Sequence, residues 1–136
     1  MKKRIILTLL ALSIVLVGCS SPNDQPAASE AATVNTITAE EAKARLDNET
    51  GIILVDVRTQ DEYNAEHIPN AILLPIDHIA ADAETIIPDK EAIYFVYCRS
   101  GNRSATASAQ LVEMGYKNIF DLGGIKDWPY DKTSAQ

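Results

Sequence analysis

The sequence predicts an α/β fold, a single small domain built on a mainly parallel sheet. Short runs of β-branched and aromatic residues alternate with segments of helical character. Two of these runs, residues 52–55 and 92–97, carry no charge, which is typical of parallel strands buried on both faces. Once the N-terminal segment is set aside, roughly 100 residues remain, the size of one small domain.

The N-terminus has the features of a targeting segment. Residues 2–4 are basic, and the apolar stretch 5–17 is interrupted only by Thr8 and Ser13. This stretch is shorter than the roughly 20 residues that a transmembrane helix needs. It ends in Leu-Val-Gly-Cys19, which resembles the lipobox of bacterial lipoproteins. The resemblance implies a signal peptide over residues 1–18 and a lipid on Cys19; an ordinary secretory signal and an uncleaved anchor are the alternatives.

Residues 19–35 have the composition of a flexible linker, rich in Ser, Pro and Ala without hydrophobic periodicity. The predicted domain covers residues 36–130, followed by a tail over residues 131–136. Lipid on Cys19 would hold this domain at a membrane of the cell envelope, facing the extracytoplasmic side as a monomer. The sequence leaves open which membrane this is.

Charge limits the classes of partner. The chain has 12 basic and 19 acidic residues, a net charge of −7. Three basic residues lie in the expected signal peptide, so the processed chain would carry nine against 19, a net charge of −10. This excess of acid argues against nucleic acid as a partner. A locally basic loop on such an acidic body indicates a small, specific anion site.

The first half of the domain begins with a helix over residues 38–48. Thr38 is its predicted N-cap and Glu41 completes a capping box. Residues 52–55 form the first predicted strand, and residues 59–64 a short turn or helix with Thr59 or Asp61 as its cap. The remaining predicted elements are a strand over 71–74, a weak helix over 76–83, a strand over 92–97, a helix over 104–114 and a strand over 118–122.

Cys98 follows the strand 92–97 and opens a polar loop that leads to the next helix. With Cys19 lipidated, it would be the only free thiol of the processed chain. A thiol between a strand end and a helix start lies among unpaired backbone N–H groups and at a positive dipole end, conditions that lower its pKa and hold an anion. A buried structural cysteine is the alternative, which the polar, glycine-containing loop disfavours.

Two other segments also follow predicted strands. Asp56 and Arg58 come at the end of the strand 52–55, and Gly123-Gly124 at the end of the strand 118–122. Ligands of parallel sheets lie beyond the carboxyl ends of the strands. We therefore expect both segments to converge on Cys98.

Several short motifs follow one another in the order found in a known family. They are Asp56-Val57-Arg58, Glu62-Tyr63, residues 66–71 (EHIPNA), residues 98–104 (CRSGNRS) and residues 123–128 (GGIKDW). Together they resemble the single-domain rhodaneses over nearly the whole domain. The resemblance implies five parallel strands with helices on both faces, and no cofactor.

The resemblance also implies a function. Cys98 would be the catalytic nucleophile of a sulfurtransferase and carry sulfur as a persulfide. The donor would be thiosulfate or another persulfide or polysulfide, and the acceptor cyanide or a thiol. The loop after Cys98 would bind the sulfur anion through its backbone N–H groups, with substrate-binding residues Arg99, Ser100, Gly101, Asn102, Arg103 and Ser104.

Three residues outside the loop are expected to support it. Asp56 and Arg58 match a pair that mostly serves as an internal brace in this family. Glu62 stands where thiosulfate-specialised members carry arginine, which weakens the case for a dianionic donor. Glu62 is instead expected to pair with Arg103 and fix the loop.

Two other functions compete with this one. Cysteine phosphatases and arsenate reductases need an arginine six positions after the cysteine, but that position is Ser104, and Arg103 is one residue short. A lipid-anchored thiol module that binds persulfide or senses oxidants would use the same loop without catalysis. No metal is expected, because no His and Cys residues have ligand spacing.

Overall fold

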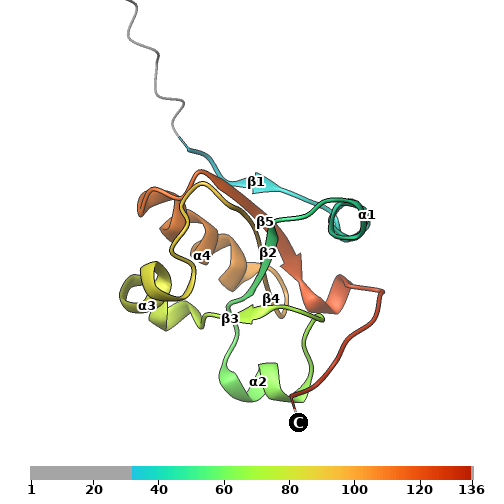
Figure 1. The fold of residues 1–136 in the computed structure, drawn as a ribbon. Coiled ribbons are helices and arrows are strands. Elements are labelled where there is room, and N and C mark those ends of the chain that lie inside the picture. The colour runs from blue at the N-terminus through green and yellow to red at the C-terminus, as the bar shows by residue number, and fades with distance from the viewer. Residues whose placement is uncertain (1–31, 136) are drawn as a thin grey trace, which may run out of the picture.

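The computed structural model contains a five-stranded sheet in which all strands run parallel (Figure 1). It describes residues 32–135, so the expected signal peptide, Cys19 and most of the expected linker lie outside the described residues. The predicted α/β fold is confirmed, with a wholly rather than mainly parallel sheet. The strands, in the spatial order β1-β5-β4-β2-β3, are β1 (Asn35–Thr36), β2 (Ile52–Asp56), β3 (Ile72–Leu73), β4 (Ile93–Cys98) and β5 (Asn118–Gly124).

Helices cover both faces of the sheet. Helix α1 lies on one face, and α3 and α4 lie on the other (Figure 1). None of the helices in residues 32–135 is long and apolar enough to cross a membrane. The helices are α1 (Ala39–Asn48), α2 (Gln60–Ala65), α3 (Ile79–Ile86) and α4 (Asn102–Glu113), with 3-10 turns at Ile76–His78 and Ile125–Asp127.

The central strand β4 shows why its sequence is apolar without alternation. Tyr94, Val96 and Cys98 face the core between the sheet and helices α3 and α4. Phe95 and Tyr97 face the second core, on the side of α1. All five side chains are buried, because each face of the strand has its own layer of helices.

Strand β1 was not predicted as a strand. It consists of two exposed residues, Asn35 and Thr36, which pair with Phe120 and Asp121 of β5. Two exposed polar residues have no hydrophobic pattern to recognise, and the sequence placed Asn35 in the linker. The backbone pairing that makes them a strand comes from β5, more than 80 residues later.

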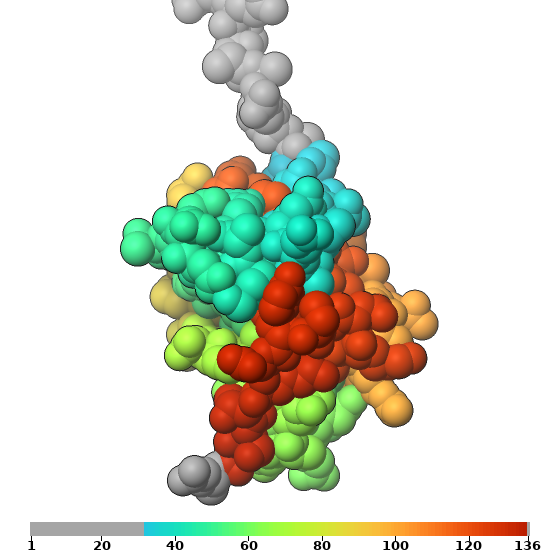
Figure 2. All heavy atoms as spheres, turned by 90° about the vertical axis from the view of Figure 1, so that its right-hand side faces the viewer, coloured from blue at the N-terminus to red at the C-terminus, as the bar shows by residue number. Residues whose placement is uncertain are grey.

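The segment after β5 runs along the surface from α1 towards α2 (Figure 2). Its residue Thr133 forms two backbone hydrogen bonds with His67, with N···O distances of 2.7 and 2.8 Å. The Ala135 N–H group donates to the carbonyl of Asn64 at 3.1 Å. The sequence placed these residues in a tail, but in the structure they are attached to the domain beside α2.

Candidate active site

The carboxyl ends of β2, β4 and β5 meet beside Cys98, as expected for a parallel sheet. Cys98 is the last residue of β4 and lies opposite Gly124 of β5. The Val57 N–H group, just after β2, donates to the carbonyl of Tyr97 at 3.0 Å. The structure therefore brings together the three segments that the sequence singled out at separate strand ends.

Cys98 itself is buried, with 1% of its surface exposed. This corrects the expectation that the thiol lies exposed on the polar loop: β4 extends one residue further than predicted and includes Cys98. The thiol is nevertheless not surrounded by apolar groups alone. The Gly101 N–H group donates to Sγ at 3.1 Å, so the loop curls back over the sulfur.

The loop lowers the pKa of the Cys98 thiol. Burial acts in the opposite direction, because desolvation disfavours the thiolate. The backbone N–H groups of Ser104, Gly101 and Ser100, together with the Ser104 hydroxyl, outweigh this burial and hold the pKa below its ordinary value. The hydrogen bonds of the loop therefore favour the thiolate form of the buried Cys98.

Two glycines make room for this curl of the loop. Gly101 has a φ of 101°, a left-handed angle that other residues adopt only at a cost of about 1–2 kcal/mol. Its turn leads directly into α4, which begins at Asn102, two residues before the predicted start. A Cβ on Gly124 would lie 2.6 Å from the Arg99 carbonyl oxygen and 2.8 Å from the Ser100 Cα. At Gly124 the loop backbone therefore passes too close to the sheet to leave room for a side chain.

Ser104 is fully buried at the base of the loop. Its hydroxyl lies 2.9 Å from the Gly101 carbonyl oxygen and 2.6 Å from Asp121 Oδ1. Asp121 Oδ1 also accepts the Gly123 N–H at 3.0 Å. Asp121 thus connects the loop to β5. Sequence reasoning assigned Asp121 no role; the only indication of one was that a charged residue stands in the mainly apolar strand 118–122.

Glu62 and Arg103 form the ion pair that the sequence led us to expect. The guanidinium binds both carboxylate oxygens, at 2.7 and 2.8 Å. These contacts lower the pKa of Glu62 to about 2, with the Arg103 hydrogen bonds as the largest cause. The pair connects α2 to the first turn of α4 and thereby holds one side of the loop.

Asp56 and Arg58 form a second, deeper ion pair. Both side chains are buried, and Arg58 Nη2 lies 2.6 Å from Asp56 Oδ2. The same nitrogen donates to the Glu66 carbonyl at 2.6 Å, and the guanidinium lies over the Tyr97 ring. This geometry is that of a brace between the end of β2 and the segment after α2, rather than of a group free to bind substrate.

A hollow of about 320 Å³ opens next to the loop. The remaining predicted loop residues, Arg99, Ser100 and Asn102, are exposed, and Arg99 lines this hollow. Lys126 and Lys132 also line it, although sequence reasoning assigned them no role; Lys126 stood inside the quoted motif GGIKDW. The complete lining is Arg58, Glu62, Ala65, Glu66, Arg99, Ile125, Lys126 and Lys132.

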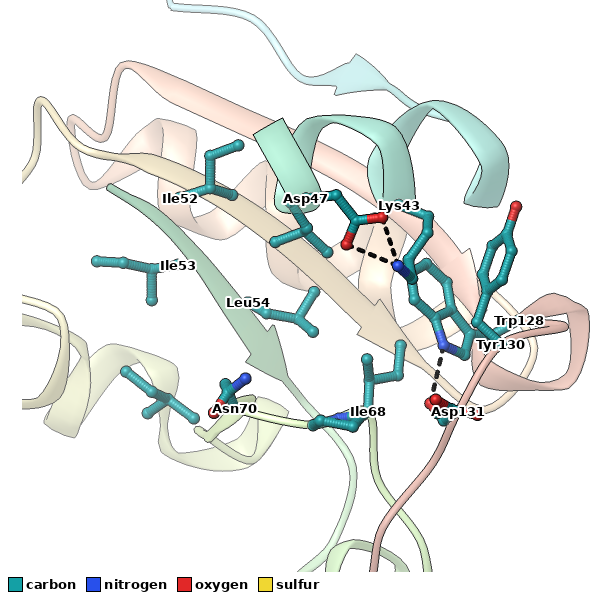
Figure 3. A pocket seen from close by; sticks show the side chains of 13 residues that line it. Lys43, Asp47, Ile52, Ile53, Leu54, Ile68, Asn70, Trp128, Tyr130 and Asp131 are labelled. Carbon is teal, nitrogen blue, oxygen red and sulfur yellow. Dashed lines mark hydrogen bonds and ion pairs between the residues drawn. The ribbon is translucent and has the colours of Figure 1, made fainter. Parts of the chain in front are cut away.

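A second hollow, of about 480 Å³, lies between α1, β2 and the segment after β5 (Figure 3). No residue of the loop 98–104 lines it. Two pairs of its polar groups bind one another: Lys43 pairs with Asp47, and Trp128 Nε1 donates to the Asp131 carbonyl. Within residues 32–135, no three His, Cys, Asp or Glu side chains are grouped so as to hold a metal ion. The chemistry therefore concentrates at Cys98.

Comparison with known proteins places this geometry in a family. Thiosulfate sulfurtransferase PspE of Escherichia coli K12 is 38% identical over 81 residues, which cover 60% of this chain and 78% of that protein. Thiosulfate sulfurtransferase GlpE of Coxiella burnetii is 40% identical over 78 residues, covering 57% of this chain and 71% of that protein.

Solved structures agree with the sequence relatives. A rhodanese from E. coli with bound anions superimposes with a TM-score of 0.58 at 35% identity, covering 61% of this chain and 98% of that one. A rhodanese-like domain protein from Staphylococcus aureus gives a TM-score of 0.64 at 33% identity, covering 71% and 93%. The sequence model of the family described as the rhodanese-like domain matches residues 38–130 of this chain. With its five parallel strands and its cysteine loop, the chain belongs to the rhodanese family.

Proposed function

We propose that the protein is a sulfurtransferase that carries a sulfane sulfur as a persulfide on Cys98. The observation that carries this proposal is the sulfur cradle: Sγ is buried and accepts the Gly101 N–H at 3.1 Å, and the loop lowers the pKa of Cys98. The same N–H groups can stabilise the terminal sulfur of a persulfide, which is an anion near neutral pH. Relatives named thiosulfate sulfurtransferases support this reaction class.

The reaction proceeds in two displacement steps. The Cys98 thiolate attacks the outer sulfur of the donor, the sulfur–sulfur bond of the donor breaks, and the leaving group departs with the electron pair. With thiosulfate the leaving group is sulfite. A nucleophilic acceptor, cyanide or a thiolate, then attacks the outer sulfur of the persulfide and returns Cys98 to the thiolate. A covalent intermediate divides the transfer into two easier steps.

The ion pair of Glu62 bears on the choice of donor. Both terminal nitrogens of Arg103 donate hydrogen bonds to the Glu62 carboxylate. Its charge is thereby neutralised for an incoming dianion such as thiosulfate. This favours a donor of lower charge, such as an organic persulfide or a polysulfide.

The competing functions find less support. A phosphatase needs a guanidinium facing the oxyanion, whereas Arg103 is turned towards Glu62 and position 104 is a buried serine. An oxidant sensor would use the same thiolate, and the relatives named thiosulfate sulfurtransferases favour sulfur transfer over sensing.

We place the protein, as part of the same proposal, at a membrane of the cell envelope as a lipid-anchored monomer. The support is the lipobox-like sequence that ends at Cys19. Metabolic labelling with a fatty acid should modify the full chain but not Cys19→Ser. Labelling of both to the same extent would disprove the anchor.

Mass analysis tests the proposed reaction directly. Purified protein incubated with thiosulfate or with inorganic polysulfide should gain the mass of one sulfur atom on Cys98, and cyanide should remove it as thiocyanate. The Cys98→Ser variant should neither gain sulfur nor produce thiocyanate above the uncatalysed rate. Equal turnover by wild type and Cys98→Ser would overturn the proposal, as would hydrolysis of an aryl phosphate at a rate comparable to sulfur transfer.

A further inference from the structure

The charges at the mouth of the site do not cancel. Four of the six charged side chains that line the hollow have partners: Arg58 binds Asp56, Glu62 binds Arg103, and Glu66 and Lys132 lie 3.5 Å from each other. The other two are Arg99 and Lys126, and neither forms an ion pair within residues 32–135. On a chain with a net charge of −7, this mouth carries two cations without counter-charges.

The backbone fixes these two cations next to each other. The Lys126 N–H group donates to the Arg99 carbonyl at 3.3 Å. Lys126 lies in the 3-10 turn directly after Gly124, the residue opposite Cys98, and the turn is anchored by buried Ile125. Both cationic side chains are exposed and line the same hollow. The backbone positions of Arg99 and Lys126 are therefore set by the loop and the sheet.

The cradle and the two cations serve different parts of a ligand. The backbone N–H groups around Sγ hold the transferred sulfur, and the cations stand outside them at the rim. Ala65 and Ile125 form apolar parts of the wall of the same hollow. A ligand that contacts both the N–H groups around Sγ and the two cations has a sulfur at one end, a short carbon chain, and an anionic group at the other end.

We propose that Lys126, together with Arg99, binds the carboxylate of a low-molecular-weight thiol that accepts sulfur from Cys98, and of the corresponding persulfide when it acts as donor. This rests on the proposed sulfurtransferase function and names its organic substrate class. In the transfer step the thiolate of the acceptor attacks the outer sulfur of the Cys98 persulfide, the bond between that sulfur and Sγ breaks, and its electron pair stays on Sγ. Both reactants are anions, so cations at the rim reduce their repulsion.

Transfer to a carboxylated and a neutral acceptor tests the subsite. The protein is first loaded with sulfur from inorganic polysulfide and then discharged into mercaptosuccinate or into 2-mercaptoethanol. The measured quantity is the ratio of the two second-order rate constants within each variant. An exposed charge contact contributes about 0.2–1 kcal/mol, so Lys126→Ala should lower this ratio about 1.4–5-fold, and Lys126→Glu should lower it further. Raising the salt concentration should reduce the wild-type ratio as well.

Lys117 supplies the matched control. It is an exposed lysine between α4 and β5 that lines neither the hollow nor the loop, so Lys117→Ala removes the same charge elsewhere and should keep the wild-type ratio. Equal ratios in wild type, Lys126→Ala and Lys126→Glu, with normal loading and normal discharge into cyanide, would overturn the subsite alone. Failure of the wild type to load sulfur would instead overturn the proposed function.

Discussion

Helices α1 and α2 begin with the same four-residue capping box but use it differently. In α1, Thr38 accepts the Glu41 N–H and Glu41 accepts the Thr38 N–H. In α2, Thr59 and Glu62 make the same reciprocal pair. The hydrogen bonds of the Glu41 carboxylate within the described residues all go to Thr38, whereas the Glu62 carboxylate also binds Arg103, 41 positions later.

The difference lies in what surrounds each box. The Glu41 side chain is solvated, and its pKa is lowered by Thr38 alone. Glu62 lies at the carboxyl edge of the sheet, where α4 begins, and the guanidinium of Arg103 lowers its pKa to about 2. A local capping motif thus becomes a tertiary contact when its acidic residue faces the cysteine loop.

The largest effect in this comparison should come from removing the two glutamates. Glu62→Ala removes both a cap contact and a bidentate ion pair, so the free energy of unfolding should fall by about 1–2 kcal/mol. Glu41→Ala removes only a cap contact and should cost distinctly less. Urea denaturation of both variants measures this, and equal losses would mean that the Arg103 pair adds no stability.

The two threonine caps should be nearly equal. Thr38→Ala and Thr59→Ala each remove one hydroxyl acceptor from a helix N-terminus, which costs about 1 kcal/mol. The same denaturation measurements apply. A much larger loss for Thr59→Ala would show that its hydroxyl serves the site as well as the helix.

Substrate preference separates the charge of Glu62 from its capping function. Glu62→Gln keeps an acceptor for the Thr59 N–H but removes the negative charge beside Arg103. The KM for thiosulfate should therefore fall about 1.4–5-fold, the range that corresponds to about 0.2–1 kcal/mol for a solvent-accessible charge contact. Glu41→Gln is the same change in the other box, and an equal fall there would refute the role of Arg103.

The smallest expected effect is the loss of the Glu62 contribution to stability at acidic pH. Because the folded-state pKa of Glu62 is depressed from 4.5 to about 2, its stabilising effect is complete above about pH 4.5 and is lost as the pH falls towards 2. Solvent screening limits this effect to about 0.5 kcal/mol. The difference in unfolding free energy between wild type and Glu62→Gln should shrink over this interval, and a constant difference would contradict the assignment.

The sequence by itself determined the elements whose signals are local. The capping box of Thr38 and Glu41 spans four residues, and its helix was predicted to its last residue. The apolar runs that became β2 and β4 were recognised because strands covered on both faces need no polar alternation. The ordered motifs around Cys98 also identified the family, which the match over residues 38–130 confirms.

Only the tertiary structure decided which distant groups meet. Strand β1 exists because β5 pairs with it, and the burial of Cys98 depends on α3 and α4 covering that face of β4. Asp121 contacts Ser104 because β5 lies beside the start of α4, and Lys126 lies beside Arg99 because the chain after Gly124 passes back over the loop. Contacts between residues tens of positions apart leave no periodicity in a sequence, since they arise from the packing of whole elements. For the same reason, Glu41 and Glu62 look alike in the sequence and differ only in the folded domain.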